Sequence, residues 1–181
     1  MNFNDAGLNI FVSVGTHEQG FPRLLSAVIE IMTTQPDSTN WRIQTGPAKM
    51  DYPAAAETQP AYSYSEMVSN LTWADAMISQ ASPGNVFNAL ATLTQPIVIA
   101  RSYELSEHVD NHQIIFADYL QTYDLAMVAE DPESLSSHLD TLRTEQPTAR
   151  LERLAQLHEA SKDRTKRWVA KFDQAISELF P

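Results

Sequence analysis

Residues 76–86, AMISQASPGNV, are the part of the sequence from which the fold can be read. An apolar run precedes the polar turn, and apolar residues return behind it at helical spacing from Val86 onward. This order predicts a buried strand, a tight turn and the opening of a helix. Ser82 is a suitable N-cap, and Pro83 suits the first helical turn because the N–H group that it lacks would have no partner there.

A helix that opens at this turn can bind phosphate. Its first N–H groups have no partner within the helix, and the helix dipole places partial positive charge there, so lysine and arginine are not required. Gly84 permits the close approach of a ligand. Strand-to-helix turns are also common in α/β domains without a ligand, so residues 79–86 taken alone favour an ordinary turn.

The composition describes one globular unit and excludes several classes of function. The 181 residues, 43% of them hydrophobic, suit a single domain with a sizeable core. We expect a cytoplasmic protein, because no apolar run approaches the ~20 residues of a membrane helix and residues 1–7 lack the basic start of a signal peptide. The absence of cysteine excludes disulfides and thiol nucleophiles, and a net charge of −11 argues against nucleic-acid binding.

Short apolar strands alternate with amphipathic helices, which is typical of a parallel sheet covered by helices on both faces. We expect an α/β domain over residues 1–147 with five to six strands. Strands are predicted at 8–14, 41–45, 76–78, 96–100 and 125–128, and helices at 21–32, from 65, from 82, at 108–120 and from 131 to about 142. Residues 47–60, rich in proline and alanine, are predicted to be a loop that borders the functional site or a partner, or a passive excursion.

The tail at residues 148–181 is predicted to be a helical extension. Its apolar residues follow a helical stripe that is interrupted around 161–166, so one long helix or two short ones are expected. The stripe packs on the sheet in one interpretation and contacts a partner in the other.

Five further motifs follow one another in a recognisable order: IFVSVGTHEQ at 10–19, IQTG at 43–46, EM at 66–67, ADAMIS at 74–79 and EHVDNHQ at 107–113. This order resembles the donor-binding, C-terminal half of GT-B glycosyltransferases. It is most similar to the small cytosolic subunits of two-part enzymes, namely the dolichol-pathway UDP-N-acetylglucosamine transferase and its bacterial exopolysaccharide counterparts. The resemblance covers about residues 8–130 and implies a single Rossmann-like half with UDP-sugar across the carboxyl ends of its strands.

The resemblance also implies where the diphosphate binds. In relatives the strand-to-helix turn reads approximately HGGAGS, and here only Gly84 keeps that pattern. Ser82 and Asn85 replace small residues and can still donate hydrogen bonds. Alternatively, the added side-chain bulk in this turn narrows the pocket, shifts its sugar preference or marks a subunit that has lost turnover.

The remaining candidate residues lie in the first and last motifs. Asp110, His112 and Gln113 are expected at the start of the next helix, with Gln113 at the family position that reads sugar hydroxyls. Glu107 can accept hydrogen bonds from ribose or sugar hydroxyls.

Gly15 and Thr16, which end the first strand, complete the substrate-binding set. His17 follows them and is the single catalytic candidate, orienting phosphate or assisting proton transfer. For each polar residue, capping or surface solvation is the alternative.

Competing motifs are incomplete. Gly15 and Gly20 have the spacing of a phosphate-binding loop, yet Phe21 and Pro22 occupy the places of its lysine and hydroxyl residue. No Gly-x-Gly-x-x-Gly follows the first strand, which disfavours a dinucleotide oxidoreductase. His108 and His112 could share one helix face, but without a convincing third ligand no metal is expected, and transfer is expected to be metal-independent.

The function that follows is the donor subunit of a two-component glycosyltransferase, moving a hexose-type sugar from UDP onto a lipid-linked acceptor in polysaccharide or glycan synthesis. A membrane-anchored, acceptor-binding subunit is the expected partner and would hold the chain at the inner face of the membrane. Alone, the chain is expected to be inactive and to form a homodimer. The alternatives are a non-catalytic nucleotide-binding or regulatory subunit with a degenerate phosphate turn, and a purely structural homodimer.

Overall fold

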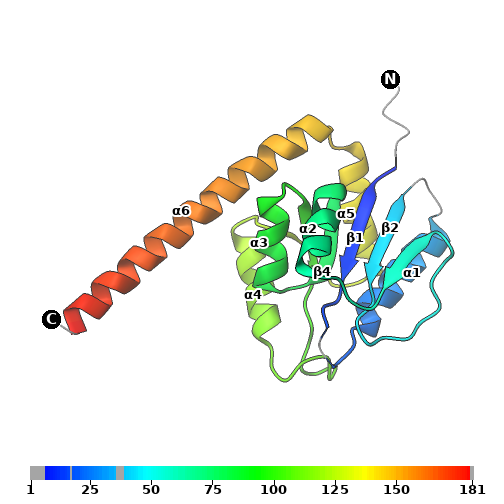
Figure 1. Cartoon of the computed structure of the whole chain (residues 1–181), viewed down its shortest axis with the longest axis horizontal. Helices are drawn as coiled ribbons and strands as arrows, with labels where there is room; N and C mark the ends of the chain where they lie inside the picture. Colours follow the sequence, from blue (N-terminus) through cyan, green and yellow to red (C-terminus); the bar gives the residue numbers. More distant parts are fainter. Residues whose placement is uncertain (1–6, 17, 36–38, 180–181) are drawn as a thin grey trace.

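The structure is a computed structural model that describes residues 7–16, 18–35 and 39–179, with side chains up to residue 167. Within these residues six parallel strands form one sheet with helices on both faces, and a long helix follows at the C-terminal end (Figure 1). The strands are β1 (Asn9–Ser13), β2 (Asn40–Gln44), β3 (Ala56–Gln59), β4 (Ala76–Gln80), β5 (Gln95–Ile99) and β6 (Met127–Val128). The helices are α1 (Pro22–Thr34), α2 (Tyr64–Trp73), α3 (Pro83–Ala91), α4 (His112–Thr122), α5 (Pro132–Thr144) and α6 (Pro147–Leu179). The predicted Rossmann-like α/β fold is confirmed.

The strand order is β3-β2-β1-β4-β5-β6, and every neighbouring pair is parallel. Strands β2 and β3 are added on one side of β1, and the chain then crosses over to add β4, β5 and β6 on the other side. Connections on the two sides of this point leave in opposite directions, and open α/β sheets typically bind ligands where the strand order reverses in this way. Ser13 pairs with Ser79 at these two strand ends.

Side chains alternate between the two faces of the sheet. In β1, Ile10 and Val12 join the core beneath α1 and α5, whereas Phe11 packs with residues of α2 and α3 on the opposite face. Each of the three is fully buried, which stabilises the fold by roughly 1.5–3 kcal/mol per side chain. The side chains of this buried strand therefore pack against helices on both faces of the sheet.

The helix starts follow the local sequence. Helix α3 has Ser82 as its N-cap residue and proline in its first turn, as predicted. Helix α5 begins with a capping box, in which the Asp131 carboxylate accepts from the Ser134 N–H at 2.8 Å. These residues set the points at which the chain leaves β4 and β6 for the next helix.

One strand was missed in the sequence, and the start of one helix was predicted wrongly. The 47–60 stretch contains β3, which pairs with β2 along the sheet edge. Its sequence AETQ carries no apolar alternation because three of its four residues are exposed. Helix α4 begins at His112 rather than His108, since the residues before it form turns in which Asn111 Oδ1 accepts from the Tyr103 N–H at 2.9 Å.

Helix α6 is continuous through the predicted interruption. Its first turns pack on α3, with Leu154 buried and Arg150 donating to Asp75 at 2.7 Å. Beyond α3 the helix runs away from the sheet (Figure 1). In the charged segment, pairs three residues apart share one side of the helix and add a small stabilisation, as where Lys162 donates to Glu159 at 2.9 Å.

Candidate functional site

The turn between β4 and α3 lies at the carboxyl edge of the sheet, beside the crossover. The Ser82 side chain makes no capping hydrogen bond, so its hydroxyl does not occupy the first N–H groups of α3. Gly84 is exposed, and a Cβ atom placed on it would meet only Ser82 Oγ, at 3.9 Å. Asn85 is half-buried one residue further into the helix. The helix opening is therefore accessible to an anion.

The ends of β1 and β2 meet in a tight backbone contact. Gly15 and Gly46 both have positive φ, at 73° and 57°. A Cβ atom on Gly46 would lie 2.7 Å from the Gly15 carbonyl oxygen, and one on Gly15 would lie 2.8 Å from the side-chain amide of Gln80. Only glycine fits this geometry without strain. Thr16, which follows, is exposed.

Gln80 connects the ends of β4 and β1. With its amide oriented to satisfy both neighbours, its nitrogen donates to the carbonyl oxygens of Ser13 at 2.9 Å and Val14 at 3.1 Å. Gln80 is one of the residues that depart from the turn sequence of the relatives. In this chain it fastens the β4 turn to the strand beside it.

Arg101 organises the loops at this edge. Its guanidinium, in a residue only 2% exposed, donates to the carbonyl oxygens of Val14 and Glu107 at 3.0 Å each, and to those of Gln19 and Gly20 at 2.8 and 3.0 Å. Burial lowers the pKa of Arg101 from its ordinary value, and the nearby Glu107 carboxylate counteracts that shift. An arginine stays charged under such a shift, so four charge-assisted hydrogen bonds join the loops after β1 and β5.

Glu107 is held by α1. Arg23 Nε donates to its Oε1 and Arg23 Nη2 to its Oε2, both at 2.8 Å, and the Ser102 N–H donates to Oε2 at 3.0 Å. With 8% exposure, the carboxylate primarily fixes the loop onto α1. A sugar or ribose hydroxyl would have to share these oxygens, and that role of Glu107 stays a prediction.

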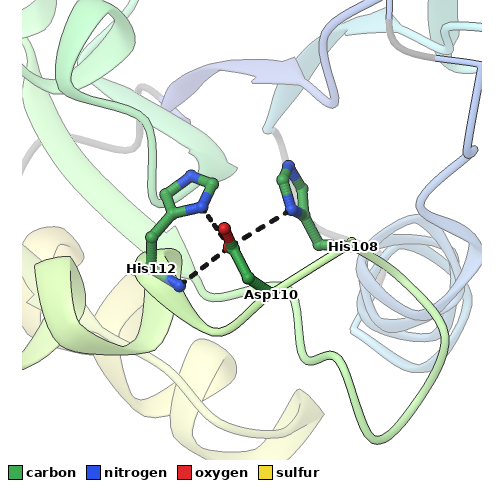
Figure 2. A group of neighbouring side chains, drawn as sticks. All are labelled: His108, Asp110 and His112. Carbon is green, nitrogen blue, oxygen red and sulfur yellow. Dashed lines mark hydrogen bonds and ion pairs between the residues drawn. The ribbon is translucent and has the colours of Figure 1, made fainter.

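Gln113, Asp110 and His112 surround the start of α4. Gln113 is buried, and its Oε1 accepts from the Arg101 N–H at 3.2 Å. Asp110 Oδ1 accepts from the His112 N–H at 3.1 Å and contacts the His112 ring nitrogen (Figure 2). The pKa of Asp110 is below its usual value, first because of the backbone hydrogen bond from His112 and then because of the ring. Asp110 and His112 are exposed.

The predicted site residues therefore gather at one edge, because each follows the carboxyl end of β1, β4 or β5 and parallel strands end on the same side. His17 lies outside the described residues. The binding role of each residue stays a prediction.

A family model identifies the fold. Residues 9–168 match the glycosyltransferase family 28 C-terminal domain. The chain belongs to this family. The match agrees with the predicted C-terminal half of the GT-B fold.

Solved structures share this fold. The calicheamicin glycosyltransferase CalG4 superimposes with a TM-score of 0.64 at 15% identity, covering 98% of this chain and 46% of its own. MurG from Acinetobacter baumannii gives 0.63 at 19% identity, covering 86% and 46%. The glycotransferase of kitacinnamycin gives 0.65 at 18% identity, covering 86% and 39%.

At these identities the likeness shows the fold alone. This family 28 domain spans less than half the length of each of the three structures. A search of curated proteins gave no match. In the described part of the chain, no helix combines the length and apolar character needed to cross a membrane.

Two arginines central to this family 28 domain are missing from the residues singled out in the sequence. Arg101 carries a signal, because it lies two residues after the fully buried strand β5, where a charge requires partners. Arg23 carries none, since it sits among ordinary helix residues and its carboxylate partner is 84 positions away.

A cavity of about 440 Å³ lies on the other side of β1, at the ends of β2 and β3. Residues from the 45–60 segment line it, among them Lys49, Tyr52 and Gln59. Burial raises the pKa of Tyr52. The segment predicted to be a loop thus combines β3 with the wall of a cavity.

Proposed function

We propose that this domain binds the UDP-sugar donor of a glycosyltransferase that transfers a hexose-type sugar. The observation that supports this most directly is the accessible opening of α3 directly after β4. Gly84 leaves the first N–H groups of the helix open, and the helix dipole favours the charge of a diphosphate there. On this proposal, donor binding and transfer need neither a metal ion nor another cofactor, because the helix opening compensates the phosphate charge.

The acceptor-binding half, on this proposal, comes from a separate membrane-anchored subunit. The chain is then cytoplasmic, held at the inner face of the membrane by that subunit, and acts on a lipid-linked acceptor in exopolysaccharide or glycan synthesis. Its resemblance to the small subunits of two-part enzymes supports this. A second wall is also needed so that the acceptor, and not water, reaches the anomeric carbon.

Exposed apolar side chains near the site are consistent with such a partner. Leu105, Val109 and Ile115, on the loop after β5 and on α4, are 59%, 68% and 70% exposed. Apolar side chains grouped at a surface are typical of interfaces. Without its partner, the chain is proposed to pair with a second copy of itself.

The test combines binding with reconstituted transfer. The purified chain is titrated calorimetrically with UDP and UDP-sugars, alone and together with a co-expressed acceptor-binding subunit. We expect nucleotide binding in either case and sugar transfer only in the complex. The absence of any response to UDP in both samples would rule out the donor role, and transfer by the chain alone would contradict the need for a partner.

A second candidate is a regulatory subunit that binds nucleotide without turnover. The side chain of Gln80 favours it, because the altered turn is fastened to β1 by two hydrogen bonds. UDP binding without transfer by the complex would support this candidate. Turnover that falls in Gln113→Ala, with the fold intact by circular dichroism, would remove it.

A further inference from the structure

We propose that His108, Asp110 and His112 form a binding site for a zinc-like divalent cation. Their potential ligand atoms all lie within 4.8 Å of one another. His108 Nδ1 is 3.6 Å from Asp110 Oδ1, and His112 Nδ1 contacts the same oxygen. The Asp110 carboxylate faces the Nδ1 atoms of both histidines, and the two imidazoles pack edge to face with their ring centroids 4.6 Å apart (Figure 2).

The spacing suits a metal ion after small side-chain rotations. Zinc binds imidazole nitrogen and carboxylate oxygen at about 2.0–2.2 Å, so ligand atoms around a tetrahedral ion stand about 3.3 Å apart. The distance between His112 Nδ1 and Asp110 Oδ1 is shorter than this ideal spacing, whereas the largest distance between ligand atoms of the cluster is longer. Asp110 and His112 have the freedom to adjust, because their side chains are 58% and 54% exposed.

The loop that carries the ligands is already ordered by its own hydrogen bonds. Arg101 donates to the Glu107 carbonyl oxygen at 3.0 Å, directly before the first ligand. Asn111, between the last two ligands, accepts from the Tyr103 N–H at 2.9 Å and donates to Glu104 Oε1 at 2.8 Å. A loop fixed in this way loses little conformational entropy when an ion binds.

The donor atoms indicate the kind of ion. Two imidazoles and one carboxylate suit zinc and neighbouring transition metals, whereas magnesium and calcium prefer oxygen ligands. Three protein ligands leave a coordination position for water or for an oxygen atom of a bound molecule. Asp110 and His112 are also among the residues predicted to bind the substrate, so the metal site adjoins the proposed donor site. Metal binding is measured without nucleotide, so its failure would leave the proposed donor role untouched.

The test uses the untagged chain and the metal alone. Zinc is titrated by calorimetry and by thermal unfolding, cobalt is followed through its visible absorption, and magnesium serves as the oxygen-preferring comparison. We expect zinc to raise the unfolding midpoint, cobalt to give absorption bands of a nitrogen- and oxygen-ligated ion, and magnesium to do neither.

Variants connect the binding to the two histidines. His108→Ala and His112→Ala should each weaken zinc binding by at least about tenfold, because even the partners of metal ligands contribute that much. His158→Ala, which removes a histidine from α6, is the matched control and should bind zinc as the native chain does. Unfolding midpoints measured without metal check that every variant folds. If His112→Ala does not fold, His112→Asn takes its place.

Three outcomes would overturn the proposal. The native chain shows no zinc-dependent change, both ligand variants retain zinc affinity within twofold, or magnesium matches zinc in affinity.

Discussion

Replacing Gly84 with valine should separate nucleotide binding from folding. Gly84 is the second residue of α3 and is exposed, and a Cβ atom there would meet only Ser82 Oγ at 3.9 Å. Glycine within a helix costs roughly 0.5–1 kcal/mol relative to alanine. Because the new side chain has room and restricts the unfolded chain, the free energy of unfolding should stay within about 1 kcal/mol of the native value or rise.

Nucleotide affinity should respond differently. A branched side chain at the helix opening stands where the diphosphate approaches the first N–H groups. A hydrogen bond to an ionised group contributes about 1.5–3 kcal/mol, so the loss of one such bond raises the Kd for UDP by roughly 10- to 150-fold.

Calorimetric titration with UDP measures the affinity, and urea unfolding measures the stability of the same preparations. Asn88→Val is the matched control, because it places the same side chain at an exposed position one turn further along α3. The control should bind UDP like the native chain. If Gly84→Val kept its Kd within about twofold, a difference of ~0.4 kcal/mol, the phosphate would bind elsewhere.

Three further changes test the architecture around the site. Gly46→Ala should destabilise the fold by about 1–3 kcal/mol in urea unfolding, because φ is 57° and the new Cβ would lie 2.7 Å from a backbone oxygen; an unchanged midpoint would refute this tight contact. Arg23→Met should cost about 1–2 kcal/mol, less than a fully buried pair because the Arg23 side chain is 34% exposed, and should speed amide exchange in the loop that Glu107 anchors; Arg23→Lys should retain part of both. The hydroxyl and N–H of Ser134 hold the pKa of Asp131 below its ordinary value, so its contribution is present above the unfolded pKa of about 3.9 and is lost as pH falls through the folded pKa. The stability advantage of the native chain over Asp131→Asn should therefore shrink on acidification in urea midpoints measured from pH 6 to 3, and a constant difference would contradict the assigned cause.

The accuracy of the sequence predictions depended on how local each signal was. The buried strands were predicted because continuous apolar runs reveal them, and the α3 opening because a serine and a proline stand where a helix starts. The edge strand β3 was predicted to be loop, since its exposed polar residues are ordered mainly through the backbone of β2. His108 was placed on a helix by its spacing, whereas the hydrogen bonds of Asn111 delay the helix by four residues.

The sequence by itself determined the strand and helix alternation, the family and the edge of the sheet at which candidate residues gather. These features depend on patterns a few residues long and on the rule that parallel strands end on one side. Only the tertiary structure decided how the candidates are held. Arg23 reaches Glu107 across 84 positions, and Arg101 binds the Val14 carbonyl oxygen across 87. The third metal-ligand candidate, Asp110, emerged only because turns bring its carboxylate close to a ring nitrogen of each histidine. Such contacts arise from chain folding in three dimensions, and residue spacing along the sequence does not encode them.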